Sequence, residues 1–236
     1  RVHRDLHGRG IAWALANQLF AWAATLGAEG PYYLIAPENE PSLAFGERGG
    51  GRWPVDVALI EFDVSAARGA RPERIREEHV ADAARLVNLP HAGEDFFEPL
   101  TPESLAARLG RDALYSIDRL CGTYEDGALV AVAGLWDKGA TTERIHRDLR
   151  AGVATRSRST AVADWGYAPD KGEAFAGLLR SIATEARALG RSTLTICESS
   201  PGVLPDTRLP ARRATVSLFT PTVKPPPAEL IGGLYA

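Results

Sequence analysis

The residues best placed to do chemistry lie at the start of the sequence, in the segment from Val2 to Ala12. Its pattern predicts the end of a strand, a turn that contains Gly8 and Gly10, and the first turn of a helix. Backbone N–H groups at a helix start lack partners within the helix, and the helix dipole places partial positive charge there. Because glycine lets an anion approach the backbone closely, this turn is suited to bind a pyrophosphate.

Local charge favours the same interpretation. The first ten residues contain three arginines, two histidines and one aspartate, in a chain whose net charge is −3. A glycine-rich turn before a helix can also be no more than a tight connection, so the motif alone leaves both interpretations open. His3 and His7 could bind a metal if they were helical, but they precede the expected helix, which favours solvated loop histidines.

The hydrophobic pattern predicts the elements that hold this turn. A helix is expected over residues 11–27, with Trp22 on its buried stripe. An Asp126-Gly127 pair between two apolar runs predicts a hairpin. No regular element beyond one helical turn is expected over residues 138–157, and Arg212-Arg213 is expected in a solvated turn. Strands are expected at 32–36, 55–64, 115–124, 128–136, 160–167, 192–197 and 214–220, and further helices at 42–48, 79–88, 102–109 and 172–189.

A weak internal repeat suggests how these elements are organised. The order strand, glycine-bearing turn, helix and strand runs from Val2 to Ala36 and again from Thr160 to Cys197. Strand–helix–strand units of this length are common in α/β proteins, so the repeat suggests a duplication. Residues 65–73 lack apolar periodicity and carry Gly and Pro, which is typical of a linker.

The turn near the start resembles the acetyl-CoA loop of the GNAT superfamily of N-acetyltransferases. That loop reads Arg/Gln-x-x-Gly-x-Gly/Ala after a strand that ends in valine. Histidine replaces the usual Arg/Gln here, and Arg4 stands where proline is common. The residues that fill the motif are Val2, His7, Gly8, Arg9, Gly10, Ile11 and Ala12.

A second element of the same superfamily follows at a plausible distance. The pattern Asn-x-x-Ala-x-x-Leu-Tyr-x-Lys-x-Gly-Phe is similar to the run that contains Asn39, Ser42, Phe45, Arg48 and Gly50. The tyrosine that often protonates the leaving thiolate falls on Gly46, and the final phenylalanine falls on Gly51. Cofactor binding is therefore implied by the resemblance, whereas the tyrosine acid is not.

The resemblance implies an α/β fold of two GNAT-like lobes with mixed, mostly antiparallel sheets. The first lobe is expected to be incomplete, because the chain has no methionine and starts at what resembles a strand end. Residues 1–64 would form the C-terminal part of a GNAT domain with the acetyl-CoA loop, 65–73 a linker, and 74–236 a second, degenerate GNAT-like domain. Acetyl-CoA would be bound by the loop residues together with Asn39, without a metal.

The implied activity is transfer of an acetyl group from acetyl-CoA to a primary amine of a small-molecule or peptide acceptor, in the cytoplasm. No catalytic residue is assigned. A non-catalytic CoA-binding or interaction module is the alternative. One CoA per chain is expected, because Asp170 and Glu173 in the second turn would repel a pyrophosphate.

Composition excludes several other classes of protein. The chain has 236 residues, of which 45% are hydrophobic and 24% charged, an ordinary globular balance. No apolar run is long enough to span a membrane, and the net charge argues against a general nucleic-acid binder. Cys121 and Cys197 have no metal-binding spacing and are expected to be buried. Structural roles are favoured for Trp136-Asp137, Asp164-Trp165 and Glu198, which lie near strand ends.

Overall fold

The computed structural model describes residues 4–6, 8–27, 33–35, 39–48, 55–92, 97–148, 152–198 and 202–219. The chain divides into a first unit, residues 1–57 with 215–236, and a second unit, residues 58–214. Strands β2 (Val55–Asp63) and β10 (Ala211–Phe219) have residues in both units. The division into 1–64, 65–73 and 74–236 stays a prediction.

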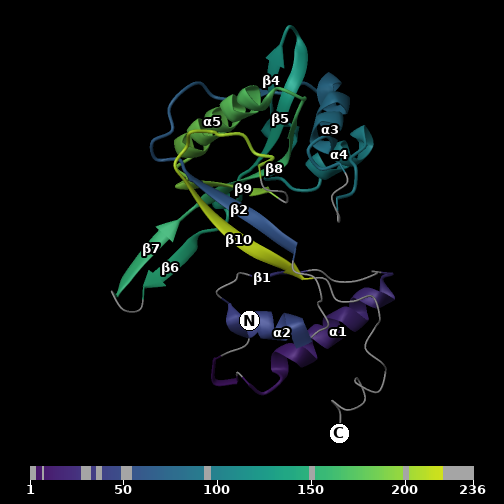
Figure 1. Cartoon of the computed structure of the whole chain (residues 1–236), viewed down its shortest axis with the longest axis vertical. Coiled ribbons are helices and arrows are strands. Elements are labelled where there is room, and N and C mark those ends of the chain that lie inside the picture. Colours follow the sequence, from purple (N-terminus) through teal and green to yellow (C-terminus); the bar gives the residue numbers. More distant parts are fainter. Residues whose placement is uncertain are drawn as a thin grey trace. The chain divides into compact units, whose positions relative to one another are not determined.

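A mixed sheet forms the centre of the second unit (Figure 1). Its strand order is β10-β2-β9-β8-β5-β4-β3, in which β8 and β9 are parallel and the other registered neighbours are antiparallel. The mixed, mostly antiparallel sheet expected from the sequence is confirmed. The strands not yet bounded are β3 (Glu73–Arg74), β4 (Leu120–Glu125), β5 (Ala128–Trp136), β8 (Ser159–Tyr167) and β9 (Thr193–Glu198).

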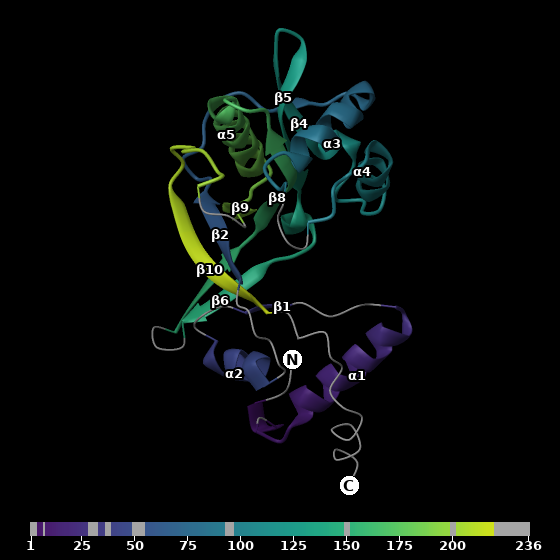
Figure 2. The ribbon, with the colours of Figure 1, turned by 45° about the vertical axis from the view of Figure 1, so that its right-hand side comes forward.

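Helices cover both faces of this sheet, and two views agree on their placement (Figures 1 and 2). Helix α5 (Gly172–Ala188) packs on one face, and α3 (Val80–Asn88) and α4 (Pro102–Leu109) pack on the other. Ala131 and Ala133 of β5 belong to the core under α5, whereas Val132 belongs to the core under α3. This alternation explains why β5 reads as an almost continuous apolar run: it is buried on both faces.

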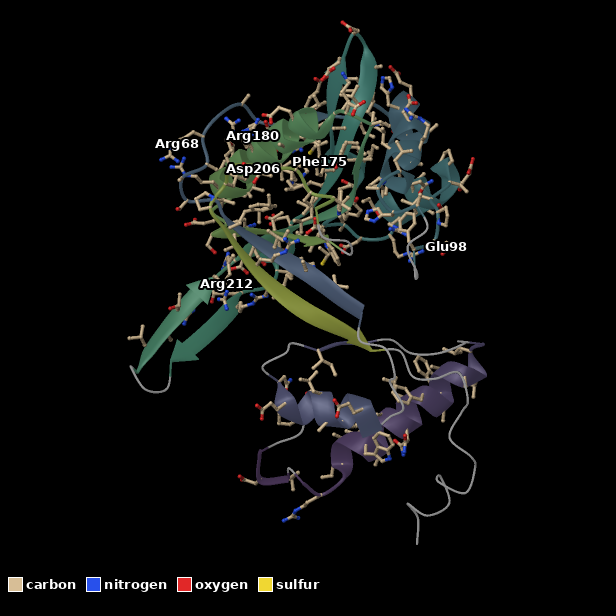
Figure 3. The ribbon with its side chains drawn as sticks, viewed as in Figure 1. Arg68, Glu98, Phe175, Arg180, Asp206 and Arg212 are labelled. Carbon is tan, nitrogen blue, oxygen red and sulfur yellow. The ribbon has the colours of Figure 1, made fainter. Side chains whose placement is uncertain are left out.

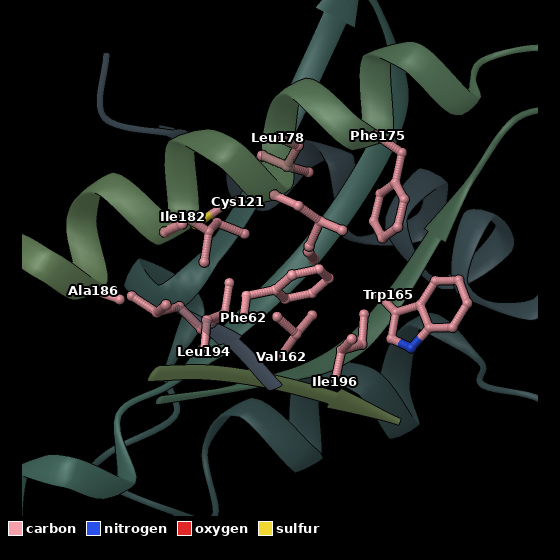
Figure 4. Close-up of a cluster of buried hydrophobic side chains, with 14 of the residues drawn as sticks. Phe62, Cys121, Val162, Trp165, Phe175, Leu178, Ile182, Ala186, Leu194 and Ile196 are labelled. Atoms are coloured by element: carbon pink, nitrogen blue, oxygen red, sulfur yellow. The ribbon is translucent and has the colours of Figure 1, made fainter. Parts of the chain in front are cut away.

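The core under α5 is built from side chains of β2, β4, β5, β8 and β9 and one face of the helix (Figure 4). Phe62, Val162 and Leu194 point from β2, β8 and β9 toward the buried face of α5. Phe175 of α5 is completely buried and points toward the sheet (Figures 3 and 4). The strand expected over residues 55–64 is confirmed, since β2 spans Val55–Asp63.

On the opposite face, α3 packs directly against the backbone of β8. A Cβ added at Gly166 would lie 2.1 Å from the carbonyl oxygen of Leu86. Only glycine therefore fits at this position, since any side chain would push the helix off the sheet. Helix α4 begins as predicted: Thr101 accepts from the Ser104 N–H at 3.1 Å, and Pro102 follows in the first turn.

The first unit contains a short 3₁₀ helix at Arg4–Leu6, helix α1 (Ile11–Thr25), strand β1 (Tyr33–Ile35) and helix α2 (Glu40–Arg48). Strand β1 pairs in antiparallel fashion with the end of β10, in the register Leu34 opposite Leu218. Trp13 of α1 meets Phe45 of α2 edge to face, with ring centroids 5.2 Å apart. The expectation of a buried Trp22 is wrong, because this side chain is 60% exposed.

The positions of most elements follow the sequence prediction, but several differ, among them β3, which includes the last residue of the expected linker 65–73. The strand expected over 115–124 begins at Leu120, after a 3₁₀ turn at Ile117–Arg119. A hairpin of β6 (Arg144–Asp148) and β7 (Val153–Ser157) was not expected. Arg212 and Arg213 lie in β10 and not in a turn.

Two further 3₁₀ turns, Glu77–His79 and Lys138–Ala140, complete the described elements. Within the described residues, no helix is long and apolar enough to cross a membrane. Gly50 and Gly51, the last positions of the second motif, lie outside the described residues.

Candidate cofactor site

The turn that leads into α1 has the backbone conformation that its two glycines favour. Gly8 and Gly10 have φ values of +76° and +74°, in the left-handed region that other residues rarely adopt. Gly10 is the N-cap of α1 and has no side chain to cap the helix. The N–H of Ala14 is bonded to the Gly10 carbonyl at 3.0 Å, so the N–H groups of residues 11–13 have no acceptor within the helix.

Space and charge at this turn are compatible with an anion. Apart from the adjoining residues, a Cβ placed at Gly8 or Gly10 would meet no atom of the described residues within 4 Å. The first turn of α1 contains no acidic residue, and Arg9 is exposed. The turn therefore presents N–H donors and the positive end of a helix dipole on a side that no described residue fills, which is the arrangement that binds phosphate groups.

The remaining predicted site residues divide into two groups. Val2 and His7 lie outside the described residues. Asn39 lies before α2, where its Oδ1 accepts from the Ser42 N–H at 3.3 Å and its carbonyl accepts from the same N–H at 2.9 Å. This capping contact accounts for an asparagine at that position, and its contact with a cofactor stays a prediction. Gly46, at the place of the superfamily tyrosine, is buried.

The corresponding helix start in the second unit differs in space and in charge. At the N-terminus of α5, a Cβ on Gly172 would lie 3.5 Å from the Cβ of Pro205, so this position is already covered. Glu173 stands in the first turn. The preceding Lys171 is bonded to Glu125 at 2.6 Å, which raises the pKa of the lysine. A pyrophosphate would find less space and a competing carboxylate here.

Near the N-terminus of α5, strands β8 and β9 stop pairing with each other. A later segment of the chain covers the place where they separate. Parallel pairing of β8 with β9 ends at Ala161 opposite Thr195, although β8 continues to Tyr167. The Tyr167 hydroxyl donates to the Val203 carbonyl, and Leu204 and Leu209 pack against the core under α5. Segment 202–209 thus lies over the end of the parallel pair. No sequence pattern indicated this, because the segment has neither helical nor strand periodicity.

Glu198, at the end of β9, holds that covering segment in place. Its side chain is 2% exposed, and its Oε1 accepts from the N–H groups of Gly202 at 2.9 Å and Leu204 at 3.0 Å. Its Oε2 is paired with Arg213 of β10. The carboxylate of Glu198 therefore has a structural role, which is the role that its sequence position favoured.

Asp164 is bound in a similar internal network. It lies in a bulge of β8 with φ +44°, and its Oδ2 accepts from the Tyr115 hydroxyl at 2.8 Å. Its Oδ1 accepts from Arg108 at 2.5 Å. Burial raises the pKa of Tyr115, so the phenol stays protonated and donates to the carboxylate. The two partners come from residues 56 and 49 positions away, a connection that local sequence patterns do not reveal.

Asp137 forms the most buried ion pair of the second unit's described residues. Arg191 donates to its two carboxylate oxygens at 2.7 and 2.8 Å, and the side chains are 6% and 9% exposed. These hydrogen bonds lower the pKa of Asp137. The pair therefore joins the end of β5 to the connection between α5 and β9.

The cysteines have different environments. Cys121 is buried, and burial raises the pKa of its thiol to about 11. Cys197 is exposed, so the expectation that both are buried is wrong for Cys197. Among the described residues, no group of three or more His, Cys, Asp or Glu side chains could hold a metal ion.

The chain is similar to known proteins at the level of structure. A scan against protein-family models found no match, and a search of curated proteins found no similar sequence. Among solved structures, the chain is similar to a GCN5-related N-acetyltransferase from Sphaerobacter thermophilus, with a TM-score of 0.63 and 14% identity. The similarity covers 95% of this chain and 71% of that chain.

Two structures of Saccharomyces cerevisiae N-myristoyltransferase with bound myristoyl-CoA are also similar. Their TM-scores are 0.59 and 0.60 at 8% and 10% identity. The similarity covers 93% of this chain but 57% and 60% of the two myristoyltransferase chains, so this chain spans less than two thirds of their length. These likenesses show that the chain has the fold of the GCN5-related N-acetyltransferases, as the sequence resemblance implied.

Proposed function

We propose that the chain belongs to an acyl-CoA-dependent acyltransferase, in which the turn before α1 binds the pyrophosphate of the donor. The observation that carries this proposal is the open, acid-free start of α1 between Gly8 and Gly10. It is supported by the fold, which is shared with a protein named as an N-acetyltransferase and with one that binds myristoyl-CoA. Acetyl-CoA is the donor that the sequence resemblance favours.

The proposed reaction is direct transfer to a primary amine. The amine nitrogen attacks the thioester carbonyl, a C–N bond forms, and the C–S bond breaks to release CoA as a thiolate. The amine loses a proton and the thiolate gains one, so the site must supply or relay a proton. Gly46 cannot donate that proton, and no described side chain is assigned this role. The part of the site that this chain supplies is therefore the binding and orientation of the donor.

The two units differ in a way that supports one donor site. The start of α1 is open, whereas Gly172 at the start of α5 lies against Pro205. Segment 202–209 also covers the end of the β8–β9 pair, where Glu198 holds it by two N–H bonds. We therefore assign donor binding to the first unit.

A thiol-release assay tests this function. The protein is incubated with acetyl-CoA and a panel of small and peptide amines, and free CoA is followed with a thiol reagent. Amine-dependent release is expected from the wild type. Release should be lost in Gly10→Glu, because the carboxylate would occupy the place of the pyrophosphate and repel it.

Gly27→Glu is the matched control for this variant. Gly27 follows the other end of α1, has φ +79°, and likewise has no atom of the non-adjoining described residues within 4 Å of a Cβ placed on it. The two substitutions thus impose similar backbone strain, but only one places charge at the helix start. Equal loss of activity in both would contradict donor binding at Gly10. CoA binding without release for any amine would instead favour a non-catalytic CoA-binding module, for which the buried Gly46 is the motivating observation.

A further inference from the structure

The β6–β7 hairpin is a strongly basic feature on an acidic protein. Residues 143–158 contain five arginines and two acidic residues, in a chain whose net charge is −3. This segment carries a local charge of the opposite sign to that of the whole chain. A surface with this charge attracts acidic partners and disfavours basic ones.

The hairpin extends from the second unit without strand partners of its own. Strands β6 and β7 form a separate two-stranded sheet, and no other strand in the described parts of the chain pairs with them. Figure 1 shows the pair running away from the large sheet. A two-stranded ribbon is marginally stable alone, and its outer edges offer unpaired N–H and C=O groups to a further strand.

Exposed apolar side chains accompany the arginines. Ile145 is 53% exposed and Val153 57% exposed. Ile145 lies directly opposite Arg156, so these two side chains share one face of the ribbon. A surface that combines arginines with exposed β-branched residues fits a polypeptide with both acidic and apolar side chains.

Ion pairs within the second unit orient three of these arginines and leave some of their N–H donors free. Glu143 lies 3.0 Å from Arg156 and 3.5 Å from Arg158, whose side chains are 69% and 51% exposed. At the base of the hairpin, Arg144 lies 3.6 Å from Glu61 of β2. Each guanidinium has five N–H donors, so those that point to solvent remain available for carboxylates of a partner.

We propose that the β6–β7 hairpin is a docking site for an extended acidic segment of a partner protein, which adds a strand to one edge of the ribbon. Backbone hydrogen bonds would hold the added strand, its carboxylates would meet the arginines, and its apolar residues would cover Ile145 or Val153. A nucleic-acid backbone would use the arginines but would leave both apolar side chains exposed, which favours the polypeptide. This proposal is independent of CoA binding.

Fluorescence anisotropy with a labelled peptide of alternating glutamate and valine tests the proposal. The intact protein should bind this peptide and should not bind the counterpart in which lysine replaces glutamate. Arg156→Glu should weaken binding about tenfold or more, and raised salt should weaken binding to the wild type. Ile145→Ser should weaken binding with little change in salt dependence, because it removes apolar contact and no charge.

Two substitutions elsewhere in the second unit are matched controls. Arg85→Glu removes an exposed arginine that also lies near a carboxylate, and Leu89→Ser removes a leucine that is 42% exposed. Both should leave peptide binding unchanged. The proposal is overturned if the glutamate–valine peptide does not bind, if the controls weaken it as much, or if an RNA oligonucleotide of equal length binds more tightly at the same salt concentration.

Discussion

The buried pair of Asp137 and Arg191 gives the sharpest stability prediction. We expect Asp137→Ala to lower the free energy of unfolding by about 3–5 kcal/mol, because it leaves a buried guanidinium without its counter-ion. The side chains are 6% and 9% exposed and joined by two hydrogen bonds, so solvent screening is small. By the usual scaling for chains of this size, the melting temperature should fall by about 6–20 °C.

The contribution of the Asp137–Arg191 pair to the stability of the fold should change with pH in a defined direction. The pKa of Asp137 is lowered in the folded protein by its bonds to Arg191. A group with a depressed folded pKa stabilises the fold above its unfolded pKa of about 3.9, and the contribution is lost as pH falls through the folded pKa. The difference in the free energy of unfolding between the wild type and Asp137→Ala should therefore be largest at neutral pH and become smaller in acid.

Glu125→Ala serves as the matched control, measured by thermal and urea unfolding alongside Asp137→Ala. Glu125 is bonded to Lys171 at 2.6 Å, but the two side chains are 43% and 40% exposed. Such an exposed pair contributes only about 0–1 kcal/mol. Equal losses from the two variants would refute the argument that burial makes the Asp137 pair important.

Two further predictions concern glycines and cysteines. Gly166→Ala should destabilise the fold by about 1–3 kcal/mol in urea unfolding, since its Cβ would lie 2.1 Å from a backbone oxygen of α3. Gly177→Ala should instead stabilise it by up to about 1 kcal/mol, because that helical position has room, and the opposite order would contradict the packing. A thiol reagent should modify Cys197 in the folded protein and Cys121 only after unfolding, because Cys121 is buried with a pKa of about 11. Rapid modification of two thiols in the folded protein would oppose this.

Local patterns predicted the elements that have one clear hydrophobic period. Helix α5 has an apolar stripe and ends before Gly190, whose φ is +73°. The β4–β5 hairpin follows from Asp126-Gly127, which have φ values of +50° and +80° as a type I′ turn requires. In such segments the residues that make the structure are neighbours in sequence.

The β6–β7 hairpin could not be found in this way because it buries no continuous face. All of β7 is exposed or half-buried, so its residues carry no alternation of apolar and polar side chains. Arg212 and Arg213 were misassigned for a similar reason: their strand is specified by neighbours that are distant in the sequence. The same holds where segment 202–209 covers the end of the β8–β9 pair, because the Tyr167 hydroxyl bonds to Val203, which lies 36 positions away.

The conformation of the turn before α1 could be predicted from local residue types, without knowledge of contacts that are distant in the sequence. The left-handed φ values of Gly8 and Gly10 and the acid-free first turn follow from residue types that are visible in the sequence. By contrast, the exposure of Trp22 was not predictable from a stripe of apolar residues, since such a stripe does not show what covers it.

A calorimetric titration of the protein with CoA tests the central claim most directly. We expect binding to saturate at one equivalent per chain, to be absent in Gly10→Glu, and to persist in Gly27→Glu. Saturation at two equivalents would contradict the assignment of donor binding to the first unit alone. Unchanged CoA affinity in Gly10→Glu would show that the turn before α1 is not the pyrophosphate site.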